Sequence, residues 1–245
     1  MKLSEIARIY KKKLPPVSNN CSIYESAQPY RTLRQFIPSN LDSNILDAGC
    51  GNGIVAKHLN NRSYTNIFTC DLFDNISNTS GIKHCISSLD ALPFQDNSFE
   101  FVYSLSVIYY LKSPQVGINE IIRVLKPGGR AIITAHTKYS LPTVWRILKR
   151  ILDIKNVEHL KGVTFYSASQ LEKMVITNDA RVIKKSGYSA NNLAFQLYKK
   201  LVKLINRYSK KQFKTRFFIL PETNSLNKIM SIFAYHSIII IQKNV

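Results

Sequence analysis

Apolar and polar residues alternate with two different periods between residues 44 and 136. Short apolar runs, typical of buried strands, are separated by segments with helical spacing, and this pattern predicts βαβ units and a parallel sheet. We expect strands at Asn44–Ala48, Asn66–Cys70, Ile82–Ser87, Phe99–Ser104 and Arg130–His136. We expect helices at Ile54–Asn60 and Val116–Leu125, the second ended by the stop signal Lys126-Pro127-Gly128-Gly129.

The pattern becomes more helical after His136. Further helices are expected at Leu141–Ile154, Ser167–Asn178 and 191–211, and further strands at Arg181–Ser186 and Tyr235–Gln242. No internal repeat and no Gly/Ser-rich linker divides the sequence, so we expect one domain over residues 1–245. Within it, 24–136 would form the core, 137–233 helical insertions and substrate-side elements, and 234–245 the last strand.

A glycine-rich turn follows the first predicted strand in the sequence Ile45-Leu-Asp-Ala-Gly-Cys-Gly-Asn-Gly53. Glycines at a strand's carboxyl end let the backbone turn sharply and approach a ligand closely. Such a turn by itself also fits a dinucleotide loop or a purely structural turn. Three later features help to decide among these roles of the turn. They are Asp71 at the end of the second strand, Leu92-Pro93-Phe94, and the Lys-Pro-Gly-Gly stop signal.

With these motifs in this order, residues 24–136 resemble the class I S-adenosylmethionine (SAM)-dependent methyltransferases, within them the methyltransferase type 11 group. The resemblance implies a Rossmann-like, doubly wound α/β fold with a seven-stranded, mostly parallel sheet, its last strand antiparallel, and helical insertions late in the chain. A nicotinamide-dependent dehydrogenase would carry Gly-x-Gly-x-x-Gly, which the spacing of Gly49, Gly51 and Gly53 does not match.

The resemblance also implies a cofactor site for SAM. Asp47 and the backbone of Gly49 and Gly51 would hold the methionine part, Asp71 the ribose, and Leu72 would lie against adenine. Ser88 stands where the family usually has an adenine-binding Asp, while Asp90 fits an exposed loop residue. The expected cofactor-binding residues are Asp47, Gly49, Cys50, Gly51, Gly53, Asp71, Leu72, Ser88, Leu89 and Ser106.

Candidate residues for binding the methyl acceptor, or for removing its proton, follow the fourth and fifth predicted strands. His136, at the end of the fifth strand, is the best-placed general base for a hydroxyl acceptor, although a histidine paired with backbone fits equally well. Tyr109 and Tyr110 could line the acceptor pocket or pack in a helix. Tyr24 and Tyr30 lie where the family has an N-terminal lid over the cofactor.

The formal net charge is +19, from 34 basic and 15 acidic residues, and it is unevenly distributed. From Ala180 to Pro221 there is no Asp or Glu, and basic residues alternate with an apolar stripe at helical spacing. Three readings fit: a solvated basic face over a packed stripe, adsorption to an anionic membrane, or binding of RNA. Nucleic acid is the least favoured, because no RNA-binding module is recognisable.

We therefore expect a SAM-dependent methyltransferase whose acceptor is a small, hydrophobic or lipid-linked molecule, methylated at oxygen or carbon. The alternatives are an RNA or soluble anionic acceptor, or a catalytically silent SAM-binding regulatory protein. We expect no metal, because the cysteines Cys21, Cys50, Cys70 and Cys85 lack ligand spacing. Without a signal peptide or an apolar run of about 18 residues, we expect a cytoplasmic protein that is either free or bound peripherally to the inner face of the membrane.

Overall fold

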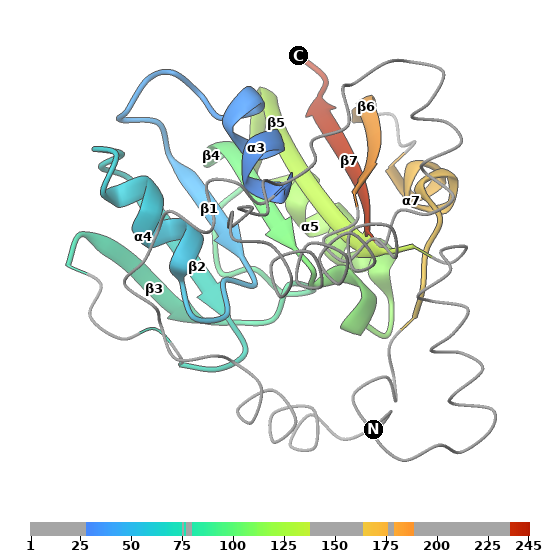
Figure 1. The fold of residues 1–245 in the computed structure, drawn as a ribbon, viewed down its shortest axis with the longest axis horizontal. Coiled ribbons are helices and arrows are strands. Elements are labelled where there is room, and N and C mark those ends of the chain that lie inside the picture. The colour runs from blue at the N-terminus through green and yellow to red at the C-terminus, as the bar shows by residue number, and fades with distance from the viewer. Residues whose placement is uncertain (1–27, 75, 77–79, 138–163, 176–178, 189–235) are drawn as a thin grey trace, which may run out of the picture.

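The computed structural model describes residues 28–245 apart from 75, 77–79, 138–163, 176–178 and 189–235. Seven strands form one sheet with the order β3-β2-β1-β4-β5-β7-β6 (Figure 1). The strands are β1 Ile45–Ala48, β2 Ile67–Asp71, β3 Ile82–Ile86, β4 Phe99–Leu105, β5 Leu125–His136, β6 Ala180–Tyr188 and β7 His236–Lys243. Strands β1 to β5 pair in parallel, whereas β7 is antiparallel to both of its neighbours. The mostly parallel sheet with an antiparallel last strand is therefore confirmed.

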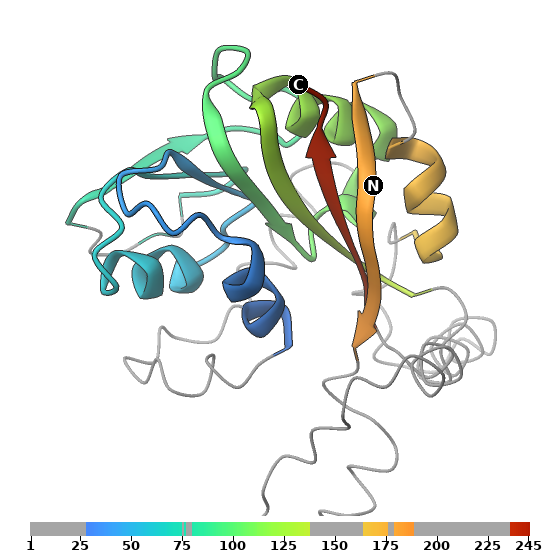
Figure 2. The ribbon, with the colours of Figure 1, turned by 90° about the horizontal axis from the view of Figure 1, so that it is seen from above.

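Helices cover both faces of this sheet, as in a doubly wound fold. Helices α3 and α4 lie on one face and α5 and α7 on the other (Figure 2). Their bounds are α3 Gln28–Phe36, α4 Ile54–Asn60, α5 Pro114–Val124 and α7 Ala168–Val175, with a short 3₁₀ helix η1 at Ile108–Tyr110. No helix in the described part of the chain is long and apolar enough to cross a membrane.

The core consists of two apolar clusters, one on each face of the sheet. Successive strand residues point to opposite faces, so Ile45 and Phe101 pack under α3 and α4 while Leu46 and Val102 pack under α5. All four of these side chains are fully buried. Each such side chain contributes about 1.5–3 kcal/mol by leaving water, and this burial holds the strand ends in place.

Strand β5 begins earlier than the sequence predicted. Helix α5 does end at Val124, but β5 starts at the next residue, so the Lys-Pro-Gly-Gly stretch lies inside the strand rather than before it. The pairing of β4 with β5 is irregular there, and Gly128 has a positive φ of 76°. A side chain on Gly129 would meet the Lys126 carbonyl oxygen at 2.8 Å. These residues therefore stop the helix and start the strand without a loop.

Two other elements differ from the expectations. Helix α3 was not predicted, although Tyr30 and Leu33 form its buried side. The helix expected at Ser167–Asn178 is observed as Ala168–Val175, and Ser167 and Gln170 exchange hydrogen bonds in a capping box at its start. The helices expected at Leu141–Ile154 and 191–211 lie outside the described residues.

Candidate cofactor and acceptor site

The glycine-rich turn lies at the carboxyl ends of β1 and β2, where adjacent parallel strands bring distant residues together. The carbonyl oxygen of Cys70 accepts hydrogen bonds from the backbone N–H groups of Gly49 at 2.8 Å and Cys50 at 3.0 Å. Gly53 then donates to the Cys50 carbonyl at 2.9 Å and caps α4. The turn is thus held to the end of β2 by backbone contacts that do not depend on side-chain identity.

Gly49 meets two independent requirements for glycine. Its φ is 87°, in the left-handed region, and a Cβ atom there would lie 2.3 Å from Cγ2 of Val107. Val107 follows the end of β4, so its methyl groups close directly over the turn. The close approach joins β1 to the segment after β4, while Gly49, Cys50 and Gly51 of the turn remain half-buried.

Replacing Gly49 by Ala is expected to lower the free energy of unfolding by about 2–4 kcal/mol, from left-handed strain plus overpacking against Val107. Gly128→Ala is the matched control, because Gly128 also has a positive φ but nothing lies within 4 Å of its Cβ position. It should lose only about 1–2 kcal/mol. Urea unfolding of both variants measures the difference, and equal losses would contradict a clash at Gly49.

Asp71 holds the turn from the end of β2. Its Oδ2 accepts a hydrogen bond from the Gly51 N–H at 2.8 Å, and its Oδ1 accepts one from the Phe73 N–H at 3.2 Å. The side chain remains half-buried. Each carboxylate oxygen can accept a second hydrogen bond, so this group is oriented by backbone and still able to bind a hydroxyl group. Its assignment to the ribose stays a prediction.

Asp47 lies at the end of β1 and is almost fully buried, with 3% of its surface exposed. Burial raises the pKa of its carboxyl group well above the ordinary value, the neighbouring Tyr103 hydroxyl opposes this, and the charge of Asp71 adds to it. Among the described residues, no Lys or Arg forms an ion pair with Asp47. A buried carboxylate of this kind is suited to a positively charged ligand group.

The remaining cofactor candidates lie around this turn but differ in exposure. Ser106, at the end of β4, has a positive φ of 66°, and its N–H donates to Oγ1 of Thr134 at 2.8 Å. Leu72 and Ser88 are half-buried, and Asp90 is exposed, as expected of a loop residue. Leu89 differs from the expectation, because its side chain is buried in the core beside Gly117 and only its backbone can reach a ligand.

His136 lies in an aromatic cluster at the end of β5. Its ring centroid is 4.2 Å from that of Tyr109, 4.4 Å from that of His236 and 6.3 Å from that of Phe165. Tyr109 is buried, while Tyr110 is half-buried with its ring 4.4 Å from that of Tyr109. The structure therefore brings three of the expected acceptor-side residues together.

The sequence missed His236, which stands 100 positions from His136 and faces it only because β7 pairs antiparallel with β5. Tyr30 lies elsewhere: it is 5% exposed and packs edge-on against His58, with 4.5 Å between ring centroids. It belongs to the core between α3 and the sheet and not to a surface that an acceptor reaches in this structure. Tyr24 lies outside the described residues.

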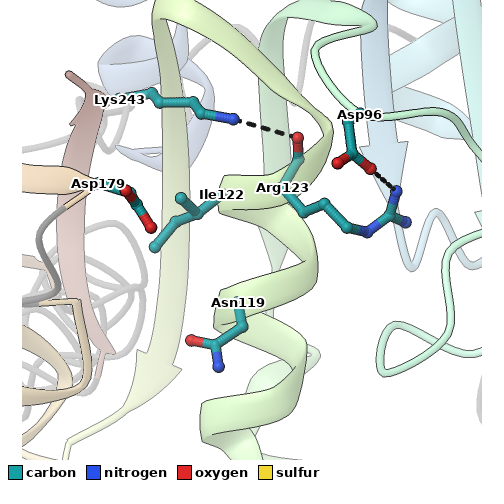
Figure 3. A pocket seen from close by; sticks show the side chains of 6 residues that line it. All are labelled: Asp96, Asn119, Ile122, Arg123, Asp179 and Lys243. Carbon is teal, nitrogen blue, oxygen red and sulfur yellow. Dashed lines mark hydrogen bonds and ion pairs between the residues drawn. The ribbon is translucent and has the colours of Figure 1, made fainter. Parts of the chain in front are cut away.

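A hollow of about 460 Å³ is lined by residues of α5, of the segment before β4 and of the end of β7 (Figure 3). Two of its basic residues bond to neighbouring groups. The Arg123 guanidinium contacts Asp96 at 2.7 Å, and Nζ of Lys243 donates to the Arg123 carbonyl oxygen at 3.2 Å. These bonds join α5 to the segment before β4 and to β7, so we assign them a structural role.

Cysteine and metal chemistry receive no support in the described part of the chain. Cys50, Cys70 and Cys85 are unbridged thiols, and burial raises the pKa of Cys70 to about 12. Thiols with raised pKa values are poor nucleophiles at neutral pH. No group of three His, Cys, Asp or Glu side chains that could hold a metal ion occurs among these residues.

Comparison with known proteins shows that the stretch containing this site is similar to a methyltransferase domain. The family model described as "Methyltransferase domain" matches residues 46–133. The mouse protein "Probable tRNA methyltransferase 9B" is 30% identical over 128 residues, covering 46% of this chain and 28% of that protein. The sterol 24-C-methyltransferase erg6 of Schizosaccharomyces pombe is 32% identical over 103 residues, covering 36% and 26%. The chain thus spans about a quarter of the length of these curated relatives.

The fold comparison extends over almost the whole chain. A solved structure described as a complex between the Haloferax volcanii Trm112 methyltransferase activator and a methyltransferase covers 98% of this chain and 96% of its own, with a TM-score of 0.61 and 15% identity. The match at residues 46–133 contains the glycine-rich turn, Asp71 and the segment after β4. Residues 46–133 therefore resemble a methyltransferase domain, and the chain has the fold of the class I SAM-dependent methyltransferases that the sequence motifs predicted.

Proposed function

We propose that the chain binds SAM at the glycine-rich turn and transfers its methyl group to a small, hydrophobic or lipid-linked acceptor at an oxygen or carbon atom. The observation that carries the proposal is the convergence of Asp47, the Gly49–Gly53 turn and Asp71 at the ends of β1 and β2. The turn offers accessible backbone, and the two carboxylates offer acceptors for the ammonium and hydroxyl groups of the cofactor.

The residues present fit this cofactor. Asp47 is a buried carboxylate without a cationic partner among the described residues, which suits a ligand that carries positive charge. The glycine-rich turn that follows it lets the backbone approach the ligand closely. When bound, SAM supplies a methyl group on a positively charged sulfur, a good leaving group. The protein's contribution is then to orient the reacting groups and exclude water, which can lower the barrier by about 7–11 kcal/mol.

His136 would take the proton from a hydroxyl acceptor. It lies at the carboxyl end of β5, next in the sheet to β4, whose end carries Ser106. Contacts with the tilted rings of Tyr109 and His236 hold the His136 ring in place, which is what a base needs in order to remain within reach of the proton. A carbon acceptor would require the same proton removal from a different atom.

The hydrophobic character of the acceptor is inferred from the aromatic cluster around His136 and from the basic, apolar-striped segment between Ala180 and Pro221. This segment would bring the protein to the anionic inner face of a membrane, where a lipid-linked acceptor is found. The sterol methyltransferase among the relatives acts on a hydrophobic molecule by its name, which is consistent with this choice.

RNA is the second candidate acceptor. The net charge of +19 suits a polyanion, and the comparisons add a relative that is described as a probable tRNA methyltransferase. Incubation of cell extract with methyl-labelled SAM and the protein, followed by separation of lipid, RNA and small-molecule fractions, distinguishes the two. Label in the RNA fraction alone would overturn the lipid-type acceptor, and no label in any fraction would favour a silent regulatory protein.

Asp71→Ala is expected to weaken SAM binding at least tenfold, because a hydrogen bond to a charged group contributes about 1.5–3 kcal/mol. Asp71→Asn is the matched control, since it keeps one oxygen as an acceptor for the Gly51 N–H that Asp71 holds at 2.8 Å. Its affinity should fall between those of the other two proteins. Titration calorimetry measures all three, and equal affinity for wild type and Asp71→Ala would contradict the assignment.

A further inference from the structure

Tyr103 lies directly beside Asp47 in the sheet. The two residues are register partners in the parallel pair of β1 and β4, so their side chains extend on the same face. Tyr103 is fully buried, and its hydroxyl group makes no hydrogen bond of good geometry with the described residues. Burying a hydroxyl group without such a bond costs free energy, and a hydrogen bond to the neighbouring carboxyl group would offset that cost.

The groups that face Asp47 carry no positive charge in the described part of the chain. Asp71 approaches from the end of β2, Cys50 from the turn and Tyr103 from β4. Tyr30, on α3, lies near enough to Tyr103 to affect its ionisation. None of these described groups is cationic, so a positively charged ligand would supply a charge that stabilises an ionised Asp47.

Resting on the proposed SAM binding, we propose that Tyr103 is a positioning residue of the cofactor site: its hydroxyl group donates a hydrogen bond to the Asp47 carboxylate when SAM binds, and Asp47 releases its proton to solvent in the same step. The proton on Asp47 is exchanged for the positive charge of the cofactor, so the buried site never holds an uncompensated negative charge. The Tyr103 proton stays on its oxygen throughout.

The structure supports both halves of this exchange. Burial raises the pKa of the Asp47 carboxyl group, which favours its protonated form in the protein without ligand. Burial and the nearby Asp47 charge raise the pKa of Tyr103 well above its ordinary value, so its hydroxyl group remains a donor. The Tyr103 hydroxyl group lies beside the Asp47 carboxyl group, so it can donate a hydrogen bond to Asp47 once the carboxylate forms.

The exchange also has a consequence for stability in the absence of SAM. Because the pKa of Asp47 is higher in the folded than in the unfolded state, the folded protein binds more protons between those two values. The contribution of Asp47 to stability is therefore fully present below the unfolded pKa and is lost as pH rises through the folded pKa. Asp47→Asn, which has no proton to lose, should be more stable than wild type at neutral pH, and this advantage should shrink as pH falls.

Titration calorimetry with SAM tests the proposal in two buffers of equal pH and different ionisation enthalpy. Wild type should release up to one proton per SAM bound, and Asp47→Asn none. Tyr103→Phe keeps the ring and removes the hydroxyl group, so the pH at which affinity is half-maximal should move up by about one to two units. Tyr64→Phe is the matched control, because its hydroxyl group bonds to the Pro38 carbonyl oxygen away from this site. It should keep the wild-type pH profile.

The outcomes separate this inference from the proposed function. If wild type does not bind SAM, the proposed function fails. If wild type binds SAM without releasing a proton, or if Tyr103→Phe keeps the wild-type pH profile, the role of Tyr103 is overturned while SAM binding stands. Thermal unfolding of wild type and Asp47→Asn without SAM provides a readout that does not depend on binding. An unchanged stability difference across pH would overturn the proton exchange.

Discussion

Replacing His136 by Ala is expected to lower kcat by about 10²–10⁴-fold while the affinity for SAM stays unchanged, which is the signature of a general base acting on the acceptor. The physical reason is that a hydroxyl group is a poor nucleophile until its proton is removed. His136 is the titratable side chain that the end of β5 presents beside Tyr109. Turnover of the labelled acceptor fraction and calorimetry with SAM measure the two quantities separately.

His136→Phe is the control that distinguishes chemistry from packing. A phenyl ring preserves the packing against Tyr109 and His236, whose centroids lie 4.2 and 4.4 Å from that of the His136 ring, but it cannot accept a proton. If the Phe variant loses as much activity as the Ala variant, the proton is what matters. Normal turnover by His136→Phe would assign His136 to packing alone.

Replacing Lys199, Lys200, Lys203 and Arg207 with Gln is expected to weaken binding to anionic vesicles by about two to three orders of magnitude, at about 1 kcal/mol for each basic residue near the surface. The expectation comes from the sequence, because these positions lie outside the described residues. The apolar stripe of the segment is left intact, so a part of the binding that salt does not remove should persist. Sedimentation with neutral and acidic vesicles at two salt concentrations measures both parts.

The control is a second quadruple variant that removes four positive charges from outside the segment between Ala180 and Pro221. Lys83, Lys112, Arg130 and Lys173 are exposed and scattered over the described surface. Replacing these four with Gln should change vesicle binding much less, because they do not share one segment with an apolar stripe. Equal losses for the two variants would show that net charge alone drives the attraction. If the wild-type protein does not bind acidic vesicles, the membrane proposal is wrong.

The strands and the cofactor turn could be predicted because their signals are local. Buried strands such as Ile45–Ala48 are short and mainly apolar, and glycine is favoured after them where φ is positive, as at Gly49. Asp71 could be placed at a strand end because a polar residue terminates an apolar run. Helix α3 was missed although Tyr30 and Leu33 have helical spacing, since two buried apolar positions in nine residues form a weak pattern.

The start of β5 was misplaced for a different reason. Pro127 and the two glycines after it are strong local turn signals, and locally they do end a helix. What keeps this stretch in the sheet is its pairing with β4, which begins at Leu125 opposite Phe99 and tolerates the irregularity at Gly128. Pairing between strands is a tertiary interaction, and here it overrides the local preference.

The sequence by itself therefore determined the fold class, the glycine-rich turn and the acidic residue after it. Only the tertiary structure placed Tyr103 beside Asp47 and His236 beside His136, and only it showed that Tyr30 and Leu89 face the core. The physical reason is that periodicity and turn chemistry act between near neighbours in the chain. The register of one strand against another is decided by the packing of the whole sheet. The residues that surround positions 103 and 236 in the sequence therefore do not indicate which residues those positions contact.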